Sequence, residues 1–332
     1  MQLHAATKKH HKTTLAIVKH MILRLLIASL FVSSCSAAPV VRPVTNGSSS
    51  TNIVTQPLEQ VPSQLSVSYF GKMRLEGKDL KLTQTEKNSA YTKYNATYMS
   101  NGLLITGVML IPNMEGSSPL VMTNHGYIDT KVYTQGRGLK REEDYLARHG
   151  FAVFHSDYRG HAASDKSPDV RNAYDAGLEY SMDVVNAISA IRSAKHAHVN
   201  ATKVGMLGHS MGGGVTMNIL TAYPDLIQAG VLYAAVNSDA WENFARWRSE
   251  RDADDQTTNV LGTRESNPKA WDALSSRTLL QNITTPLLIF QGTKDKDVPL
   301  EWSKDLATRL VSLKKDFAYI EYERDAHEFG TK

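Results

Sequence analysis

The stretch "VGMLGHSMGGGVTMNIL" (residues 204–220) places a serine between an apolar run and a glycine-rich run. Gly208-His209-Ser210-Met211-Gly212 fits the pattern Gly-x-Ser-x-Gly. The apolar residues before it are typical of a buried strand, and Gly213 to Leu220 can continue as a helix. A serine on such a tight strand-to-helix turn has strained backbone angles and an exposed hydroxyl, and small flanking residues let strand and helix pass closely. The stretch therefore indicates a nucleophile at Ser210.

The rest of the chain repeats this strand-then-helix order. Residues 91–100 and 103–112 are strand-like and are joined by Asn101-Gly102, the strongest short hairpin signal. A hairpin followed by alternating strands and helices predicts an α/β fold, with one twisted, mainly parallel sheet and helices on both faces. The predicted parallel strands are residues 119–126, 151–160, 203–210, 229–236, 286–292 and 317–323, and the predicted helices are 140–150, 181–194 and 301–315.

Residues 238–280 interrupt the alternation. The segment is charged and contains three of the four tryptophans, Trp241, Trp247 and Trp271. Because it is longer than an ordinary connection, we expect a small cap over the carboxyl ends of the strands. The alternative is a surface excursion with helices of its own.

The composition is that of a soluble globular protein, with 42% hydrophobic and 21% charged residues in a chain of 332. The formal net charge of +4 has a local origin, because residues 1–35 contain five lysines and arginines and no acidic residue. Without that segment the net charge is −1. The basic excess therefore gives no reason to expect a nucleic acid partner.

The basic N-terminal segment is predicted to be a signal peptide covering residues 1–35, starting at Met1 or Met21. Its apolar run, residues 25–32, is too short to span a bilayer. Residues 32–35 resemble a bacterial lipobox, in which Cys35 becomes the lipidated first residue. Cleavage after Ala38 fits ordinary signal peptidase, although the proline that follows would hinder it. We therefore expect an exported, membrane-anchored lipoprotein, with a periplasmic or secreted protein as the alternative.

Two further parts follow the signal peptide. Residues 36–65 are rich in Pro, Ser, Thr, Asn and Gln and show no apolar period, which is typical of a flexible tether. Residues 66–332 form the predicted catalytic domain, including the expected cap at 238–280.

A serine hydroxyl becomes a good nucleophile only when a base takes its proton, and a third group must orient that base. In this type of sheet the acid should follow a later strand and the histidine should follow the strand after it. The stretch "PLLIFQGTKDKDVP" supplies Asp295 and Asp297, and "FAYIEYERDAHEFG" supplies His327. The order Ser, Asp, His therefore predicts a catalytic triad.

These motifs, together with "DYRGHAASD" after residue 156, resemble the α/β-hydrolase superfamily and, more narrowly, the catalytic domain of the prolyl oligopeptidase family. The resemblance covers about residues 90–330 and includes no propeller. It implies that Ser210 is the nucleophile and His327 the general base and acid. It also implies that Asp295 is the orienting carboxylate, with Asp297 as the alternative.

The family resemblance also implies an oxyanion hole. One donor is expected to be the backbone N–H of Met211, the residue after the nucleophile. The second is expected in the turn His125-Gly126-Tyr127, which resembles the family's His-Gly oxyanion turn. We expect the backbone N–H of Tyr127 to fill that role, with its phenol as the alternative.

The sequence contains no metal-binding histidine motif and no phosphate or dinucleotide loop, so we expect no metal and no cofactor. Of the other histidines, His209 is expected to pack beside the nucleophile, His125 to brace its turn by hydrogen bonding, and His161 to be a loop residue. The predicted function is a serine hydrolase that acts on small peptides or carboxylic esters through an acyl-enzyme. The alternative is a catalytically silent hydrolase fold that serves as a binding module on the cell surface.

Overall fold

The computed structural model describes residues 66–167, 178–248 and 257–329, which belong to one compact unit, Gln60–Lys332. The signal peptide 1–35, the lipid attachment at Cys35 and the tether 36–65 lie outside the described residues and stay predictions. Among the helices that are described, none is both long and apolar enough to cross a membrane.

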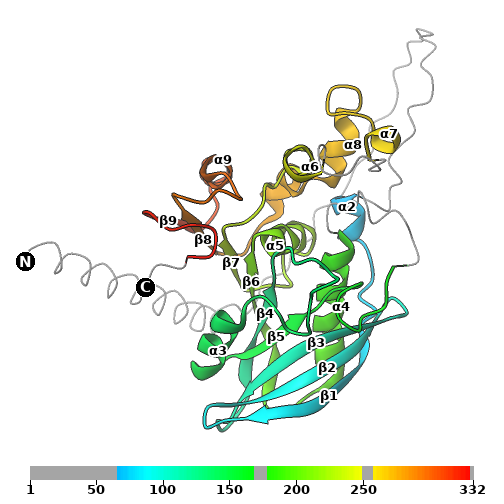
Figure 1. The fold of residues 1–332 in the computed structure, drawn as a ribbon, viewed down its shortest axis with the longest axis vertical. Coiled ribbons are helices and arrows are strands. Elements are labelled where there is room, and N and C mark those ends of the chain that lie inside the picture. The colour runs from blue at the N-terminus through cyan, green and yellow to red at the C-terminus, as the bar shows by residue number, and fades with distance from the viewer. Residues whose placement is uncertain (1–65, 168–177, 249–256, 330–332) are drawn as a thin grey trace, which may run out of the picture. The chain divides into compact units, whose positions relative to one another are not determined.

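The described residues build one sheet in the strand order β1-β2-β3-β5-β4-β6-β7-β8-β9 (Figure 1). The pairs β1–β2, β2–β3 and β3–β5 are antiparallel, and all later pairs are parallel. The predicted hairpin and the mainly parallel sheet are therefore confirmed. The strands are β1 Lys78–Lys87, β2 Tyr91–Ser100, β3 Leu103–Pro112, β4 Ser118–Asn124, β5 Ala152–Ser156, β6 Val199–His209, β7 Ala229–Tyr233, β8 Leu287–Gly292 and β9 Phe317–Tyr322.

The β2–β3 hairpin follows from its two turn residues. Asn101 has φ 48° and Gly102 has φ 84°, and both are positive as the two-residue hairpin turn requires. The turn sets the register, in which Ser100 pairs with Leu103. Strand β1 was not predicted, because its lysines and other polar residues are mostly exposed on the edge of the sheet. Charged residues on an edge strand hinder pairing with other chains.

The direction of the strand connections changes at β4. Helix α3 (Lys140–Arg148) leads from β4 to β5 on one side, and α4 (Leu178–Ala194) leads from β5 back across β4 to β6. Because crossovers between parallel strands are right-handed, α3 lies on one face of the sheet and α4 and α5 (Met211–Ala222) on the other (Figure 1). The loops after β4 and β6 therefore leave the sheet side by side, where ligand sites form in such folds.

The main core lies between the sheet and helices α4 and α5. Val184, Ile188 and Ile191, which the sequence places on one helical face, are fully buried and pack with Phe154 and Met206 of the central strands. Burying a side chain of this size contributes about 1.5–3 kcal/mol. Helix α9 (Leu300–Ser312) corresponds to the predicted helix at 301–315 and contacts β8.

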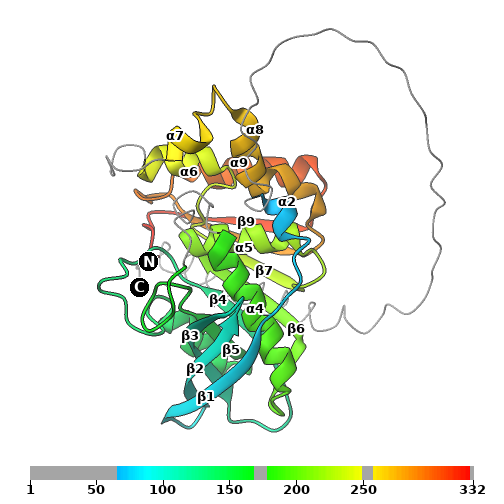
Figure 2. The ribbon, with the colours of Figure 1, turned by 90° about the vertical axis from the view of Figure 1, so that its right-hand side faces the viewer.

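The segment predicted as a cap contains helices α6 (Ala240–Trp247), α7 (Thr257–Leu261) and α8 (Pro268–Leu274), followed by the 3₁₀ helix η4 (Ser276–Asn282). It has a small core of its own, and Figure 2 shows α6, α7 and α8 grouped at one end of the molecule. The role of this segment as a cap stays a prediction. The small core consists of Ala240, Phe244, Leu261, Ala270, Trp271 and Leu274.

Candidate active site

Ser210 lies on the predicted turn between a strand and a helix. Strand β6 ends at His209, α5 begins at Met211, and Ser210 between them has φ 54° and ψ −121°. Such angles are strained for a residue with a side chain and persist only where surrounding contacts hold them. Here the N–H of Ser210 donates to Tyr233 O at 3.0 Å, and its carbonyl accepts from Val236 N at 3.1 Å. Strand β7 and the residues after it therefore hold the turn from both sides.

The glycines of the Gly-x-Ser-x-Gly pattern are required by close packing around this turn. A Cβ on Gly208 would overlap the backbone of Gly212 and the hydroxyl of Thr216. A Cβ on Gly212 would overlap the carbonyl of Asn124 at the end of β4. Glycine at these two positions lets β4, β6 and α5 meet directly beneath Ser210.

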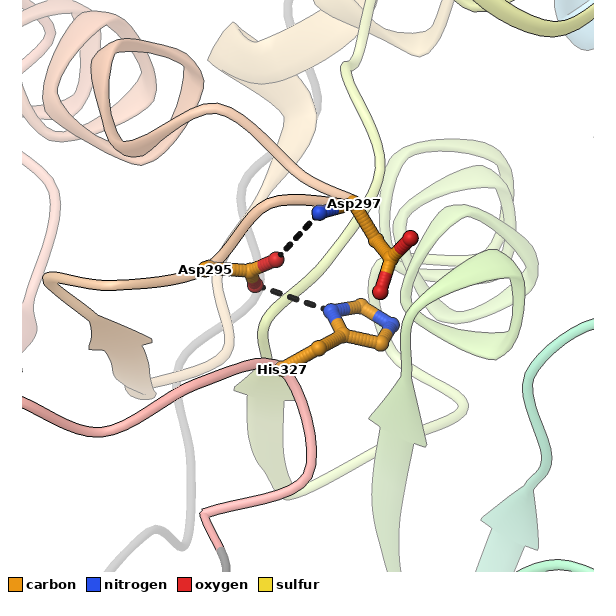
Figure 3. Close-up of side chains that lie close together, drawn as sticks. All are labelled: Asp295, Asp297 and His327. Carbon is orange, nitrogen blue, oxygen red and sulfur yellow. Dashed lines mark hydrogen bonds and ion pairs between the residues drawn. The ribbon is translucent and has the colours of Figure 1, made fainter.

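The predicted acid and base are joined by a hydrogen bond (Figure 3). Asp295 follows β8, His327 follows β9, and His327 Nδ1 lies 2.8 Å from Asp295 Oδ2. The Asp295 side chain is completely buried, whereas that of His327 is 13% exposed. Three further donors hold the carboxylate: Gln291 Nε2 to Oδ2 at 2.8 Å, and the backbone N–H groups of Asp297 and Val298 to Oδ1 at 2.9 Å each.

These contacts lower the pKa of Asp295 and raise the pKa of His327. Burial by itself raises the pKa of Asp295, but hydrogen bonds from His327, Val298 and Asp297 outweigh it and lower the pKa below the usual value. Burial likewise lowers the pKa of His327, yet the hydrogen bond and charge of Asp295, with Asp297 and Glu328, raise it overall. An ionised Asp295 keeps the proton of His327 on Nδ1, which leaves Nε2 free to accept a proton.

His209 connects the base to the serine turn. Its Nε2 donates to the backbone carbonyl of His327 at 3.2 Å, and the two rings lie 4.6 Å apart between centroids. Because His209 directly precedes Ser210, this bond joins the loop of His327 to the turn of Ser210. His209 therefore braces the loop that carries His327, the predicted base.

Asp297 does not share the position of Asp295. It contacts Asp295 only through its backbone N–H, and its own carboxylate is exposed beside the His327 ring (Figure 3). Asp295, Asp297 and His327 each offer one potential metal-ligand atom, and these atoms lie within 4.8 Å of one another. The Asp295–His327 hydrogen bond already uses one atom of each residue.

The predicted oxyanion turn lies against Ser210. A Cβ added to Gly126 would lie 3.0 Å from Ser210 Cβ, so the backbone after β4 passes directly beside the serine. Tyr127 follows, and 76% of this residue is exposed. Its backbone N–H donates to no other group in the described part of the chain. Met211 is the first residue of α5, where the N–H has no partner within the helix.

Sequence reasoning missed the groups that hold the acid. Gln291 is the penultimate residue of β8 and was counted only as part of an apolar run. Arg246 on α6 donates from its guanidinium to the carbonyls of Asp297 at 2.6 Å and Lys296 at 2.7 Å. This contact spans about fifty positions and has no sequence motif. Ser303 Oγ donates to Gln291 Oε1 at 2.7 Å, and both side chains are buried. This contact likewise has no sequence motif.

Comparisons with known proteins agree with this geometry. A model of the prolyl oligopeptidase family matches residues 138–332. The chain belongs to the prolyl oligopeptidase family. It is 27% identical over 244 residues to the uncharacterized peptidase YuxL of Bacillus subtilis, a match that covers 69% of this chain and 34% of YuxL.

Solved structures show the same α/β-hydrolase fold. An acylaminoacyl peptidase of Pyrococcus horikoshii aligns with a TM-score of 0.61 and 22% identity over 73% of this chain and 38% of that chain. The acetyl xylan esterase 1 of Thermoanaerobacterium sp. JW/SL YS485 aligns with a TM-score of 0.56 and 16% identity, over 82% of this chain and 93% of that one. The chain thus spans 34% of the length of YuxL and 38% of the length of the Pyrococcus horikoshii peptidase.

Proposed function

We propose that this protein is a serine hydrolase that cleaves carboxylic esters or the amide bonds of small peptides through an acyl-enzyme. The observation that carries the proposal is the buried Asp295–His327 pair, tied by His209 to the strained turn of Ser210. The hydrogen bond between Asp295 and His327, and the bond from His209 beside Ser210 to the His327 backbone, support a triad of the kind that nucleophilic catalysis needs. Membership of the prolyl oligopeptidase family supports the same reaction class.

In the proposed mechanism the Ser210 hydroxyl attacks the carbonyl carbon of the substrate, and its proton passes to His327 Nε2. The carbonyl oxygen becomes an oxyanion that accepts hydrogen bonds from the N–H groups of Met211 and Tyr127. The tetrahedral intermediate then expels the alcohol or amine, which takes the proton from His327. Water repeats the sequence on the acyl-enzyme, with His327 as its base, and releases the acid together with the free serine.

The Tyr127 backbone N–H is favoured over the phenol as the second donor. The backbone of Gly126 lies beside Ser210, whereas Tyr127 is 76% exposed, so its phenol lies largely in solvent. A preorganised donor is the one that contributes most to catalysis, because it does not have to be ordered in the transition state.

The experiment compares the turnover of p-nitrophenyl acetate with that of aminoacyl p-nitroanilides, using the wild-type chain and Ser210→Ala. Ser210→Ala removes the nucleophile, and the contacts that hold the turn are made by its backbone and stay in place. We expect turnover that is abolished in Ser210→Ala. Ester turnover alone would define an esterase, and comparable anilide turnover would define a peptidase. A folded protein that hydrolyses neither substrate would favour the silent binding module instead.

We also propose that the protein is exported and anchored through a lipid on Cys35. The support is the basic, then apolar, then small-residue order of residues 1–35. Expression in a bacterial host with labelled palmitate, compared with Cys35→Ser, tests this. Label on the wild type and none on the variant is the expected result, and an unlabelled, membrane-free wild type would contradict it.

A further inference from the structure

An arginine of α6 binds the acid loop, which is the connection between β8 and α9 at residues 293–299. Arg246 lies in the last turn of α6, within the segment predicted as a cap. Its Nε donates to the backbone carbonyl of Asp297 at 2.6 Å, and its Nη2 donates to that of Lys296 at 2.7 Å. The planar fork of a guanidinium fits two neighbouring acceptors, and bonds from a charged donor are stronger than neutral ones. One side chain of α6 therefore holds two consecutive carbonyls of the acid loop.

These carbonyls belong to the same peptide units as the N–H groups that hold Asp295. The carbonyl of Lys296 is joined to the N–H of Asp297, and the carbonyl of Asp297 is joined to the N–H of Val298. Each N–H donates to Asp295 Oδ1 at 2.9 Å, and Figure 3 shows the bond from Asp297. Because both peptide units are planar and trans, their C=O and N–H bonds point in opposite directions. The guanidinium and the carboxylate thus hold the two peptide units from opposite sides.

We infer that Arg246 is a positioning residue of the triad: through the peptide units 296–297 and 297–298 it holds the Asp295 carboxylate in the orientation that binds His327 Nδ1. This inference rests on the proposed function. Arg246 contacts no reacting atom and acts only through the acid loop. It makes the segment predicted as a cap a part of the support of the catalytic site.

The position of the carboxylate depends on this loop at one of its two oxygens. Oδ2 accepts from Gln291 and His327, whereas the bonds to Oδ1 come from the two N–H groups of the acid loop. In the part of the chain that the structure describes, no backbone N–H donates to the carbonyls of Lys296 and Asp297. Hydrogen bonds in series also polarise one another, so a charged donor on each C=O makes the N–H of that peptide a better donor to Asp295.

The guanidinium of Arg246 is held by two aromatic rings. Its Cζ lies 5.7 Å from the ring centroid of Trp247 and 5.9 Å from that of Trp302. The two rings meet edge to face, with centroids 5.5 Å apart at 85°. Trp302 lies in the first turn of α9, directly after the acid loop. Because cations are attracted to aromatic faces, the rings favour the position from which Arg246 binds the loop.

The other end of α6 is also joined to α9. Asp239 is the N-cap of α6, and its carboxylate pairs with Arg277 of η4 at 3.2 Å. Arg277 in turn pairs with Asp305 on α9 at 3.0 Å. Helix α6 is thus attached to α9 near both of its ends. Arg246 therefore projects from an element whose place is fixed, as a positioning group requires.

The main test is a double-mutant cycle on kcat for p-nitrophenyl acetate. Arg246 is an exposed residue, and Arg246→Met keeps an apolar stem beside the rings while it removes every donor. We expect it to lower kcat roughly 5- to 30-fold with little change in KM, because a small displacement of a supporting group is costly. In the Asp295→Asn background the same change should lower kcat by less than about twofold, because the carboxylate through which Arg246 acts is then absent.

Arg264→Met is the matched control. Arg264 lies in the same segment, and its guanidinium pairs with Asp272 at 2.8 Å and with Asp239 at 3.7 Å. The substitution therefore removes the same charge from the same segment without a change in the acid loop, and Asp239 keeps its shorter pair with Arg277. We expect kcat to stay within about twofold of the wild-type value.

The outcomes of the cycle separate this inference from the proposed function. An unchanged kcat in Arg246→Met would overturn the inference. Equal losses in Arg246→Met and Arg264→Met would also overturn it, as would a loss that persists in full in the Asp295→Asn background. In each of these cases the proposed function stands. A wild type without any Ser210-dependent hydrolysis would remove both.

Proton NMR observes the positioned bond itself. The proton between His327 Nδ1 and Asp295 Oδ2 is in a hydrogen bond to a carboxylate and resonates downfield of the amide protons. In Arg246→Met we expect this signal to move upfield and to exchange faster with water, while Arg264→Met leaves it in place. A purely structural role would lower the free energy of unfolding without moving the signal. An unmoved signal in folded Arg246→Met would therefore contradict the inference.

Discussion

Asp295→Asn is the substitution that tests the candidate triad most directly. The carboxylate accepts four hydrogen bonds, two at each oxygen. An asparagine keeps only one acceptor oxygen. The backbone N–H groups of Asp297 and Val298 cannot turn away from Oδ1, so the amide oxygen takes that place and the NH₂ group takes the place of Oδ2. The NH₂ group then faces His327 Nδ1, which must give up its proton and become an acceptor.

The expected loss follows from this change of tautomer. His327 then carries its proton on Nε2, the atom that has to accept the proton of Ser210, so the resting enzyme has no base. A base held in the wrong tautomer lowers kcat by about 10³–10⁴-fold, which corresponds to roughly 4–5 kcal/mol of transition-state stabilisation. KM should change little, because Asp295 is buried and does not reach the substrate.

The assay is steady-state hydrolysis of p-nitrophenyl acetate, with circular dichroism to show that the variant is folded. Asp297→Asn is the matched control, since it makes the same change two residues away on an exposed side chain, and its kcat should stay within about threefold. A folded Asp295→Asn enzyme with kcat within tenfold of the wild type would refute the reasoning. A severe loss in Asp297→Asn alone would make Asp297 the orienting acid.

Three further substitutions test other contacts of the site and the core. Asp297 helps to raise the pKa of His327, and His327 can act as a base only when it is neutral. Asp297→Asn should therefore move the acidic limb of the kcat/KM–pH profile to lower pH. A shift to higher pH would contradict this. His209→Phe removes the bond to His327 O but keeps a ring, and should lower kcat by about 3- to 30-fold with an unchanged circular dichroism spectrum, whereas wild-type kcat would show that the bond is dispensable. Tyr98→Phe deletes a buried hydroxyl that bonds to Ser156 at 2.8 Å and to Asp183 O at 2.9 Å. The free energy of unfolding in urea should therefore fall by about 1–3 kcal/mol, with activity retained. A change below roughly 0.5 kcal/mol, about the error of the method, would argue against it.

The parts of the fold that sequence alone predicted are those with strong local signals. Apolar runs marked the buried strands, and Asn101-Gly102 marked the hairpin, because a two-residue turn with two positive φ angles favours these residues. Strand β1 was not predicted because it is an exposed edge strand, rich in lysine, without an apolar run. Strand order was also beyond the sequence: the placement of β5 beside β3 depends on the crossover directions and not on any one segment.

The candidate site divides in the same way. Ser210, Asp295 and His327 lie in short motifs directly after strands, so their positions could be read along the chain. Their supports could not. Arg246 on α6 donates to the carbonyls of Lys296 and Asp297, close to Asp295. The stack around His125 joins a side chain of β5 to side chains from the loops after β4 and β5. Such contacts form only when the chain folds, and no spacing of residues along the sequence predicts them.

The strained turn at Ser210 also implies a cost in folding stability for the serine that the proposed activity requires. Any side chain at this position is held at φ 54°, where glycine alone has no steric penalty. Ser210→Ala would inherit the same strain, but a glycine there would relieve it and could make the inactive chain the more stable one by about 1 kcal/mol. Folding alone would thus favour glycine at this turn, and the proposed catalytic role of the hydroxyl explains why a serine is found there instead.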